Sequence, residues 1–180
     1  MTAPVRYTGV AIAFHWITAL LIVANLLLGV SMVRLPLSPQ KLQWYFWHKS
    51  IGLTIFLLTS LRLLWRLWRP APSPVPMPDW QRRASKISHA ALYVLLFVIP
   101  LSGWIYSSST GVQVVYLGLF PLPDLVAKDR ALAAVLRATH ITLNAALFAL
   151  ICVHAGAALR HHFVERDEVL HRMLPLVRPK

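Results

Sequence analysis

The stretch RATHITLNAALFALICVHAG, residues 137–156, decides the fold because it combines an apolar run with two histidines. From Ala138 to Leu159 the chain has no Lys, Arg, Asp or Glu, which suits the interior of a lipid bilayer. His140 and His154 nevertheless stand within it, and a buried imidazole without a partner is costly. The segment is therefore expected to cross a membrane, with each histidine bound to a partner.

The composition of the whole chain indicates an integral membrane protein. Of the 180 residues, 57% are hydrophobic and only 13% are charged, whereas soluble domains carry about 25% charged residues. The net charge of +12 would also suit a nucleic-acid binder, but such proteins gather their charge on a soluble face. Here Lys and Arg separate apolar runs, so the expected partner is the lipid membrane and no nucleic acid is expected.

Four apolar segments are long enough to cross, since about 20 helical residues span the hydrocarbon. The first could instead be a cleaved signal peptide, but its apolar run is longer than usual and only Arg6 precedes it. Residues 69–79 are Pro-rich and predict an extended linker, and residues 108–136 form the longest loop. The sequence thus predicts one domain, residues 1–180, folded as an all-α membrane four-helix bundle with spans at about 8–33, 44–68, 88–107 and 138–160.

Lys and Arg are unevenly divided between the two sides of this bundle. Twelve of the 18 precede the first span, flank the 69–79 linker or lie in the C-terminal tail, and six lie in the first and third loops. The side richer in Lys and Arg faces the cytoplasm. We therefore expect a multi-pass protein of the bacterial inner membrane, with both termini cytoplasmic and the 108–136 loop periplasmic.

The spans place four histidines at two depths: His15 and His154 near the cytoplasmic side, His48 and His140 near the outer side. On a helix, 14 residues rise about 21 Å and return to within about 40° of the same face, so the fourth span can serve two stacked sites. Two imidazoles from different helices suit axial ligation of heme iron. Zinc prefers tetrahedral, often charged, ligand sets, and no Asp, Glu or Cys accompanies the pairs. For any one of these histidines considered alone, the alternative to a metal ligand is a buried side chain whose polar groups are hydrogen-bonded within the protein.

Several stretches resemble the bacterial cytochrome b561 family, in particular its small four-helix di-heme members. They are AIAFHWIT (11–18), WHKSIGLTIFLLTSLRLLWRLWRP (47–70), SHAALYVLLFVIPLSGW (88–104), ATHITLN (138–144) and VHAGAALRHHF (153–163). The resemblance implies two b-type hemes between the helices. It assigns His15 and His154 to the inner iron and His48 and His140 to the outer iron. Because Cys152 is the only cysteine, covalent attachment through a C-x-x-C-H motif is excluded.

The resemblance also implies an activity, that of a superoxide:ubiquinone oxidoreductase. Superoxide would be oxidised at the periplasmic side and its electrons passed through the two hemes to ubiquinone. With both axial positions filled by histidine, electron transfer would be outer-sphere at the heme edge, so no separate catalytic residue is expected. The alternative is an electron-transfer subunit that links a periplasmic redox partner or dehydrogenase to the quinone pool. A protein without redox activity would leave the four paired histidines unexplained.

Further residues are candidates for contacts with these groups. Lys49 and Arg137 adjoin outer histidines, and Arg62 and Arg66 lie near the inner end of the second span. All four are candidates for heme propionates, with lipid phosphates as the alternative partners. The outer loops carry a net charge of +4, which would attract superoxide. The alternative is that these charges only lie at the membrane interface or pair with propionates.

Two other histidines are candidates for ubiquinone. His161 follows His154 by two helical turns, and His89 begins the third span on the cytoplasmic side. Either could donate a hydrogen bond to a quinone carbonyl and supply a proton. The alternative for both is an ordinary histidine at the membrane interface.

Overall fold

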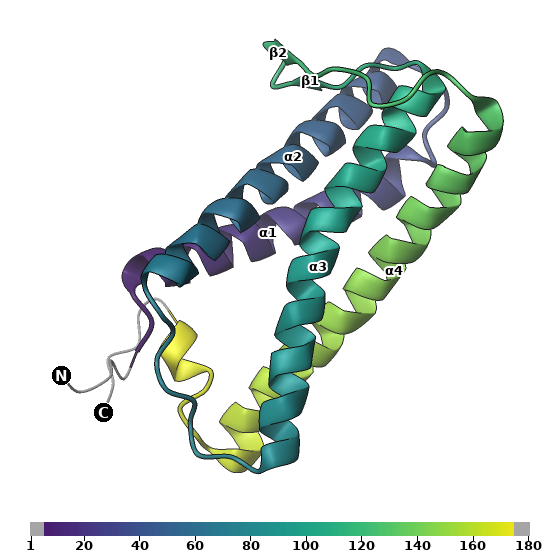
Figure 1. Ribbon diagram of the computed structural model, residues 1–180. Coiled ribbons are helices and arrows are strands. Elements are labelled where there is room, and N and C mark those ends of the chain that lie inside the picture. Colours follow the sequence, from purple (N-terminus) through teal and green to yellow (C-terminus); the bar gives the residue numbers. More distant parts are fainter. Residues whose placement is uncertain (1–5, 175–180) are drawn as a thin grey trace.

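Four long helices make up most of the chain. The computed structural model describes residues 6–174. The helices are α1 (Gly9–Met32), α2 (Pro39–Trp68), α3 (Asp79–Thr110) and α4 (Arg130–Arg160), as Figure 1 shows. All four are long and apolar enough to cross a membrane. The expected all-α membrane four-helix bundle is confirmed.

Polar residues cap the beginning of three of the helices. The side chains of Thr8, Ser38 and Asp129 accept hydrogen bonds from backbone N–H groups in the first turns of α1, α2 and α4. Such caps satisfy amides that have no partner within the helix. At the other end of α3, Gly111 takes a left-handed conformation, with φ of 77°, which a residue without Cβ adopts without strain.

Three helices extend beyond the spans expected from hydropathy. α2 begins at Pro39 rather than 44, α3 at Asp79 rather than 88, and α4 at Arg130 rather than 138. The reason is that the first turns of these helices contain polar residues and lie outside the apolar windows. The Pro-rich linker therefore covers residues 69–78, where 69–79 was expected, and the loop expected at 108–136 is shortened to residues 111–129.

The loop between α3 and α4, which the sequence predicts on the outer side, carries a small antiparallel hairpin, β1 (Val115–Tyr116) and β2 (Phe120–Pro121). It bends over the outer end of the bundle in Figure 1. The Tyr116 hydroxyl lies 3.2 Å from Thr54 Oγ1, and the Leu117 amide donates to Ser50 Oγ at 3.3 Å. The hairpin is thereby attached to α2 close to the outer histidines.

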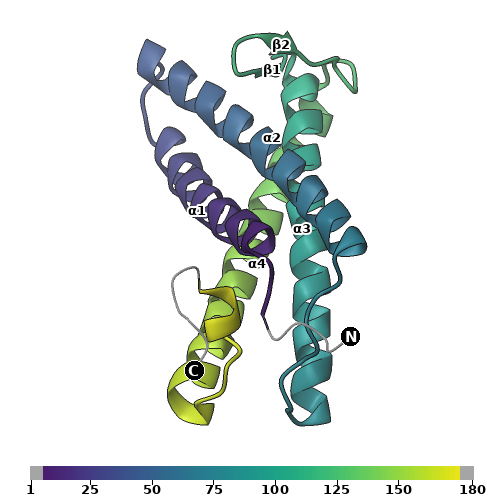
Figure 2. The same ribbon diagram turned by 90° about the vertical axis from the view of Figure 1, so that its left-hand side faces the viewer.

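The apolar core lies in the middle of the bundle. The main helix pairs are α1 with α2 and α3 with α4, and Figure 2 shows the two pairs crossing. All four helices contribute to one cluster of buried side chains: Ile22, Ile55, Leu96, Ile99 and Leu147. Leu20, Leu64 and Phe148 instead point outward and are at least 60% exposed, as expected for side chains that face lipid.

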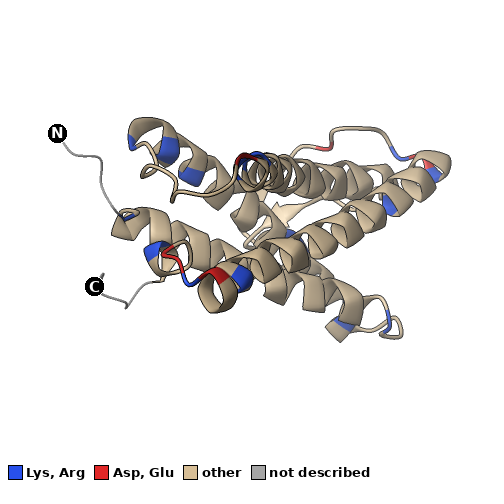
Figure 3. Cartoon of the chain, turned by 90° about the horizontal axis from the view of Figure 1, so that it is seen from below, with Lys and Arg blue, Asp and Glu red and all other residues tan. Residues whose placement is uncertain are grey.

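The two ends of the bundle differ. At the end opposite the hairpin, the short helix η1 (His161–Glu165) lies beside the start of α3, and η2 (His171–Met173) lies beside the first half of α1. Figure 3 shows the charged residues mainly at helix ends and in connecting segments. Two basic residues counted for the orientation, Arg178 and Lys180, lie outside the described residues.

Candidate functional site

The structure brings the four histidines together as two pairs. The ring centroids of His15 on α1 and His154 on α4 are 6.3 Å apart. Those of His48 on α2 and His140 on α4 are 6.2 Å apart. Since α4 contributes one histidine to each pair, the sites are stacked along it, about 21 Å apart at 1.5 Å per residue. The apolar core lies between them.

This spacing fits two imidazoles that bind one metal ion from opposite sides. A metal–imidazole bond is about 2.0 Å and the ring nitrogen is about 1.1 Å from the ring centre, so the two centres would be about 6 Å apart. His89 also adjoins His154, but their ring centroids are only 5.2 Å apart. The separation therefore favours His15 over His89 as the partner of His154.

Hydrogen bonds fix the tautomer of both outer histidines. Nδ1 of His48 lies 3.3 Å from the backbone oxygen of Asn25, which can only accept. Nδ1 of His140 lies 2.8 Å from Ser102 Oγ, and that hydroxyl donates its proton to the Ile99 carbonyl at 2.7 Å. Ser102 must then accept from Nδ1–H. Nε2 of each ring is left with a free lone pair, which is the form that binds a metal.

Two glycines allow the outer imidazoles to approach the neighbouring helices. A Cβ at Gly29 on α1 would lie 3.1 Å from Cε1 of His48, and one at Gly103 on α3 would lie 3.0 Å from Cε1 of His140. Both distances are shorter than ordinary van der Waals contact. Glycine is therefore needed at both positions for the pair to keep its present geometry.

A cavity of about 560 Å³ adjoins the outer pair. Its wall is mostly apolar and includes Phe46, Phe56, Trp104 and Leu147, with His48 and His140 among its polar groups. This size and lining are typical of a site for an organic cofactor. The outer pair thus combines two metal-binding nitrogens with room for a large planar group, which fits a heme.

Comparison with known proteins identifies the family. A family model described as prokaryotic cytochrome b561 matches residues 6–176. The chain belongs to this family. It is 36% identical to cytochrome b561 homolog 2 of Escherichia coli K12 over 95% of this chain and 92% of the relative. It is 30% identical to the probable superoxide oxidase CybB of Yersinia pestis, over 94% of this chain and 96% of that protein.

Membership of the cytochrome b561 family establishes the general chemistry. The protein is a membrane cytochrome that uses b-type heme for electron transfer. The family membership predicted from the sequence motifs is thereby confirmed. A more distant relative, cytochrome b562 of Cereibacter sphaeroides, is 27% identical over 97% of the chain and 98% of its own length.

The inner site of this cytochrome differs from the outer site in its polar contacts. Nδ1 of His15 is buried and has no hydrogen-bond partner within residues 6–174. His89 lies beside His154, and its Nδ1 is 3.3 Å from Ser85 Oγ. The guanidinium of Arg62 lies over the ring of Tyr93, 5.6 Å from its centroid, so it is held between α2 and α3 at the inner end.

The other basic candidates have different surroundings. Lys49 donates to Ser107 Oγ at 2.6 Å, so its ammonium is directed toward α3 beside the outer cavity. Arg66 and Arg137 are exposed and make no hydrogen bond or ion pair in the described part of the chain. Lys49 and Arg62 are thus fixed by protein contacts, whereas Arg66 and Arg137 are directed outward.

His161 lies in a cluster that the sequence did not predict. Its Nδ1 contacts Asp167 Oδ2 at 2.6 Å and Glu165 Oε2 at 2.7 Å. The spacing of His161 and Glu165 by four residues was a detectable signal for a helical contact. Asp167 was not detectable in this way, because it reaches His161 only after the chain reverses. Ser102, Gly29 and Gly103 were also missed, since their role depends on contacts between helices.

Proposed function

We propose that this cytochrome is a di-heme superoxide:ubiquinone oxidoreductase. The observation that carries the proposal is the presence of two histidine pairs, each spaced for bis-imidazole ligation, at two depths of one membrane bundle. His48 and His140 would hold the outer heme, and His15 and His154 the inner one. The hemes would supply one-electron transfer across the membrane between them. The 30% identity to a probable superoxide oxidase supports superoxide as the donor.

At the outer face, the residues of the chain would attract and orient the donor. The outer loops and the adjoining ends of α2 and α4 carry six basic residues against Asp124 and Asp129. Such an excess of positive charge speeds encounter with a small anion. Lys49, held by Ser107 at 2.6 Å, is the proposed partner of an outer propionate, together with Arg137. Arg62 and Arg66 are proposed for the inner heme.

At the inner face, His161 and His89 would bind ubiquinone. His161 lies seven residues after His154, about 10 Å along the helix, so a quinone at its imidazole would be close to the inner site. His89 adjoins His154 directly. Each imidazole could donate a hydrogen bond to a quinone oxygen and supply a proton. Because the inner end carries the larger share of Lys and Arg, this side is assigned to the cytoplasm of the bacterial cell.

The decisive experiment uses the isolated protein in detergent or liposomes. Superoxide and a ubiquinone analogue are supplied, and quinol is measured together with the visible spectrum of the hemes. Rapid quinol formation, with about two hemes per chain, is expected. A protein that contains heme but makes no quinol from superoxide would contradict the proposed activity.

A second candidate function is favoured by the outer hairpin. Leu119 and Phe120 at its tip are 72% and 60% exposed, so this end presents apolar side chains beside a basic rim. Such a surface could receive a periplasmic redox protein, and the chain would then be an electron-transfer subunit that serves the quinone pool. Quinone reduction that required addition of a second protein would support this function over the first.

A further inference from the structure

The C-terminal end of α4 turns back around His161. Beyond Arg160 the helix continues as one π-helical turn, η1, and Arg166 then takes a left-handed conformation with φ of 53°. The amide of Asp167 donates to the His161 carbonyl at 3.2 Å, which closes the turn. Single π turns of this kind are frequently found at functional sites. The chain reversal brings Asp167 next to the imidazole of the residue that began the turn.

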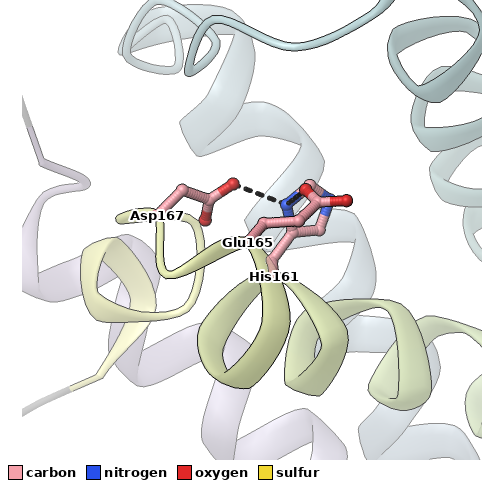
Figure 4. A group of neighbouring side chains, drawn as sticks. All are labelled: His161, Glu165 and Asp167. Carbon is pink, nitrogen blue, oxygen red and sulfur yellow. Dashed lines mark hydrogen bonds and ion pairs between the residues drawn. The ribbon is translucent and has the colours of Figure 1, made fainter.

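Two carboxylates contact the same imidazole nitrogen, as Figure 4 shows. Asp167 Oδ2 and Glu165 Oε2 lie 2.6 and 2.7 Å from Nδ1 of His161. The three side chains are only 14–24% exposed. A carboxylate accepts hydrogen bonds and donates none. Nδ1 of His161 must therefore carry the proton.

Other contacts hold the two carboxylates in this orientation. The second oxygen of Asp167 accepts the Val169 amide at 2.9 Å. The second oxygen of Glu165 accepts from the side chain of Gln81 on α3 at 2.9 Å and pairs with Arg160 at 3.0 Å. In each carboxylate, one oxygen is thus bound to neighbouring protein groups and the other contacts the imidazole. Helix α3, the end of α4 and the return segment all contribute.

We propose that Glu165 and Asp167 are positioning residues for proton transfer from His161 to ubiquinone. They keep the proton on Nδ1 and thereby make Nε2 the nitrogen that exchanges protons. In Figure 4, Nε2 lies on the side of the ring away from Asp167. The carboxylates also balance the positive charge of the imidazolium, as the aspartate of a catalytic triad does. The inference rests on the proposed reduction of ubiquinone at the inner face.

The step balances as follows. Ubiquinone takes up two electrons, supplied by two superoxide ions that become dioxygen, and two protons. For one proton, the Nε2–H bond of the imidazolium breaks and an O–H bond forms on a quinone oxygen. The neutral imidazole keeps its Nδ1 proton between the carboxylates, and water at the cytoplasmic surface returns a proton to Nε2. A second cycle supplies the second proton.

The test uses the heme-loaded full chain with Asp167→Asn and Glu165→Gln, singly and together. Each amide keeps an oxygen for the Val169 or Gln81 contact but presents an N–H group that can donate to Nδ1, which permits the wrong tautomer. The matched control is Glu168→Gln, which removes a carboxylate of the same segment that is 53% exposed and contacts Arg172 rather than His161. A circular dichroism melt establishes that each variant is folded.

Three quantities are measured: the rate of heme reduction by superoxide, kcat and KM for a ubiquinone analogue, and ¹⁵N shifts of the His161 ring. The ring shifts are recorded with the hemes reduced and diamagnetic, and His161→Asn assigns the signal. We expect heme reduction to be unchanged in the double variant while kcat falls at least about tenfold with little change in KM. The ¹⁵N shifts should move from the Nδ1–H form toward the Nε2–H form. Glu168→Gln should match the unchanged protein.

Three outcomes would overturn the inference. One is an unchanged kcat in the folded double variant. Another is a lower kcat with the ring still in the Nδ1–H form, since the carboxylates would then act in some other way. The third is binding of Mn²⁺ by His161, Glu165 and Asp167 together, because the metal would then occupy Nδ1 of His161 in place of the proton. Failure of the proposed function is distinguishable from all three, because the unchanged protein would then make no quinol from superoxide.

Discussion

A single serine fixes the orientation and protonation of one proposed heme ligand. Ser102 Oγ donates to Ile99 and so can only accept from Nδ1–H of His140. Hydrogen bonds of this kind give a ligating imidazole more electron density and hold its ring plane. His48 has the weaker equivalent, a 3.3 Å contact with the Asn25 carbonyl, and His15 has none in the described residues. The outer ligands are thus better supported than His15.

Ser102→Ala tests this support. The variant removes the acceptor for Nδ1 of His140, so the outer site should bind heme about tenfold more weakly, and the reduction potential of the outer heme should rise. A redox titration followed in the visible spectrum measures both hemes. The matched control is Ser109→Ala on the same helix, since the Ser109 side chain is also buried but its hydroxyl donates only to the Tyr106 carbonyl. A shift confined to the inner heme would contradict the assignment.

Removing an outer histidine tests the pairing itself. His140→Ala or His48→Ala should lower the heme content from about two to about one per chain, since a b-type heme is held by its axial ligands. The remaining heme should keep the potential of the inner one. His171→Ala, which changes a histidine of η2 outside both pairs, serves as the control. Loss of the inner heme from the His140 variant would show that the histidines pair differently.

At the scale of the helices, the close approach of α3 to α4 depends on a glycine. Gly103→Ala would place a methyl group 3.0 Å from Cε1 of His140, so either the ring or the helix must shift. We expect loss of the outer heme and destabilisation of about 1–3 kcal/mol, measured as heme content and as the midpoint of thermal unfolding.

Gly156→Ala on α4 is the matched control, because a Cβ there meets nothing within 4 Å. Alanine favours a helix over glycine by up to about 1 kcal/mol, so this variant should be as stable as the unchanged protein or more so. Equal heme content in the two variants would contradict the proposed role of Gly103.

Hydropathy predicts the helices better than it predicts their ends or the contacts around the site. The apolar runs identified all four crossings, because lipid requires about 20 apolar residues in each. Hydropathy could not detect the polar first turns of α3 and α4, which begin at Asp79 and Arg130. The depth of each histidine followed from the order of the spans. The contacts of Ser102 and Asp167 could not be predicted in this way. The first depends on how α3 and α4 are rotated about their axes, and the second depends on the chain reversal after η1.

At the scale of the whole molecule, charge is distributed between the ends of an apolar bundle. The proposed outer face has a net charge of +4 and the proposed donor is an anion. If attraction brings superoxide to this face, the second-order rate constant for heme reduction should fall as salt screens the charges, by about two- to tenfold between about 20 and 300 mM NaCl. Pulse radiolysis or stopped-flow mixing at several salt concentrations measures the rate.

Variants at the two ends separate steering from a general effect of salt. Lys128→Gln with Arg130→Gln lowers the charge of the outer face and should reduce both the rate at low salt and its dependence on salt. Arg82→Gln with Arg83→Gln makes the same change at the opposite end, where α3 begins, and should leave both quantities unchanged. Electrostatic steering would be contradicted if the rate constant for heme reduction did not depend on salt. It would also be contradicted if the two double variants changed this rate constant equally. The outer charges would then serve only to anchor the bundle at the membrane interface, and diffusion alone would set the encounter with superoxide.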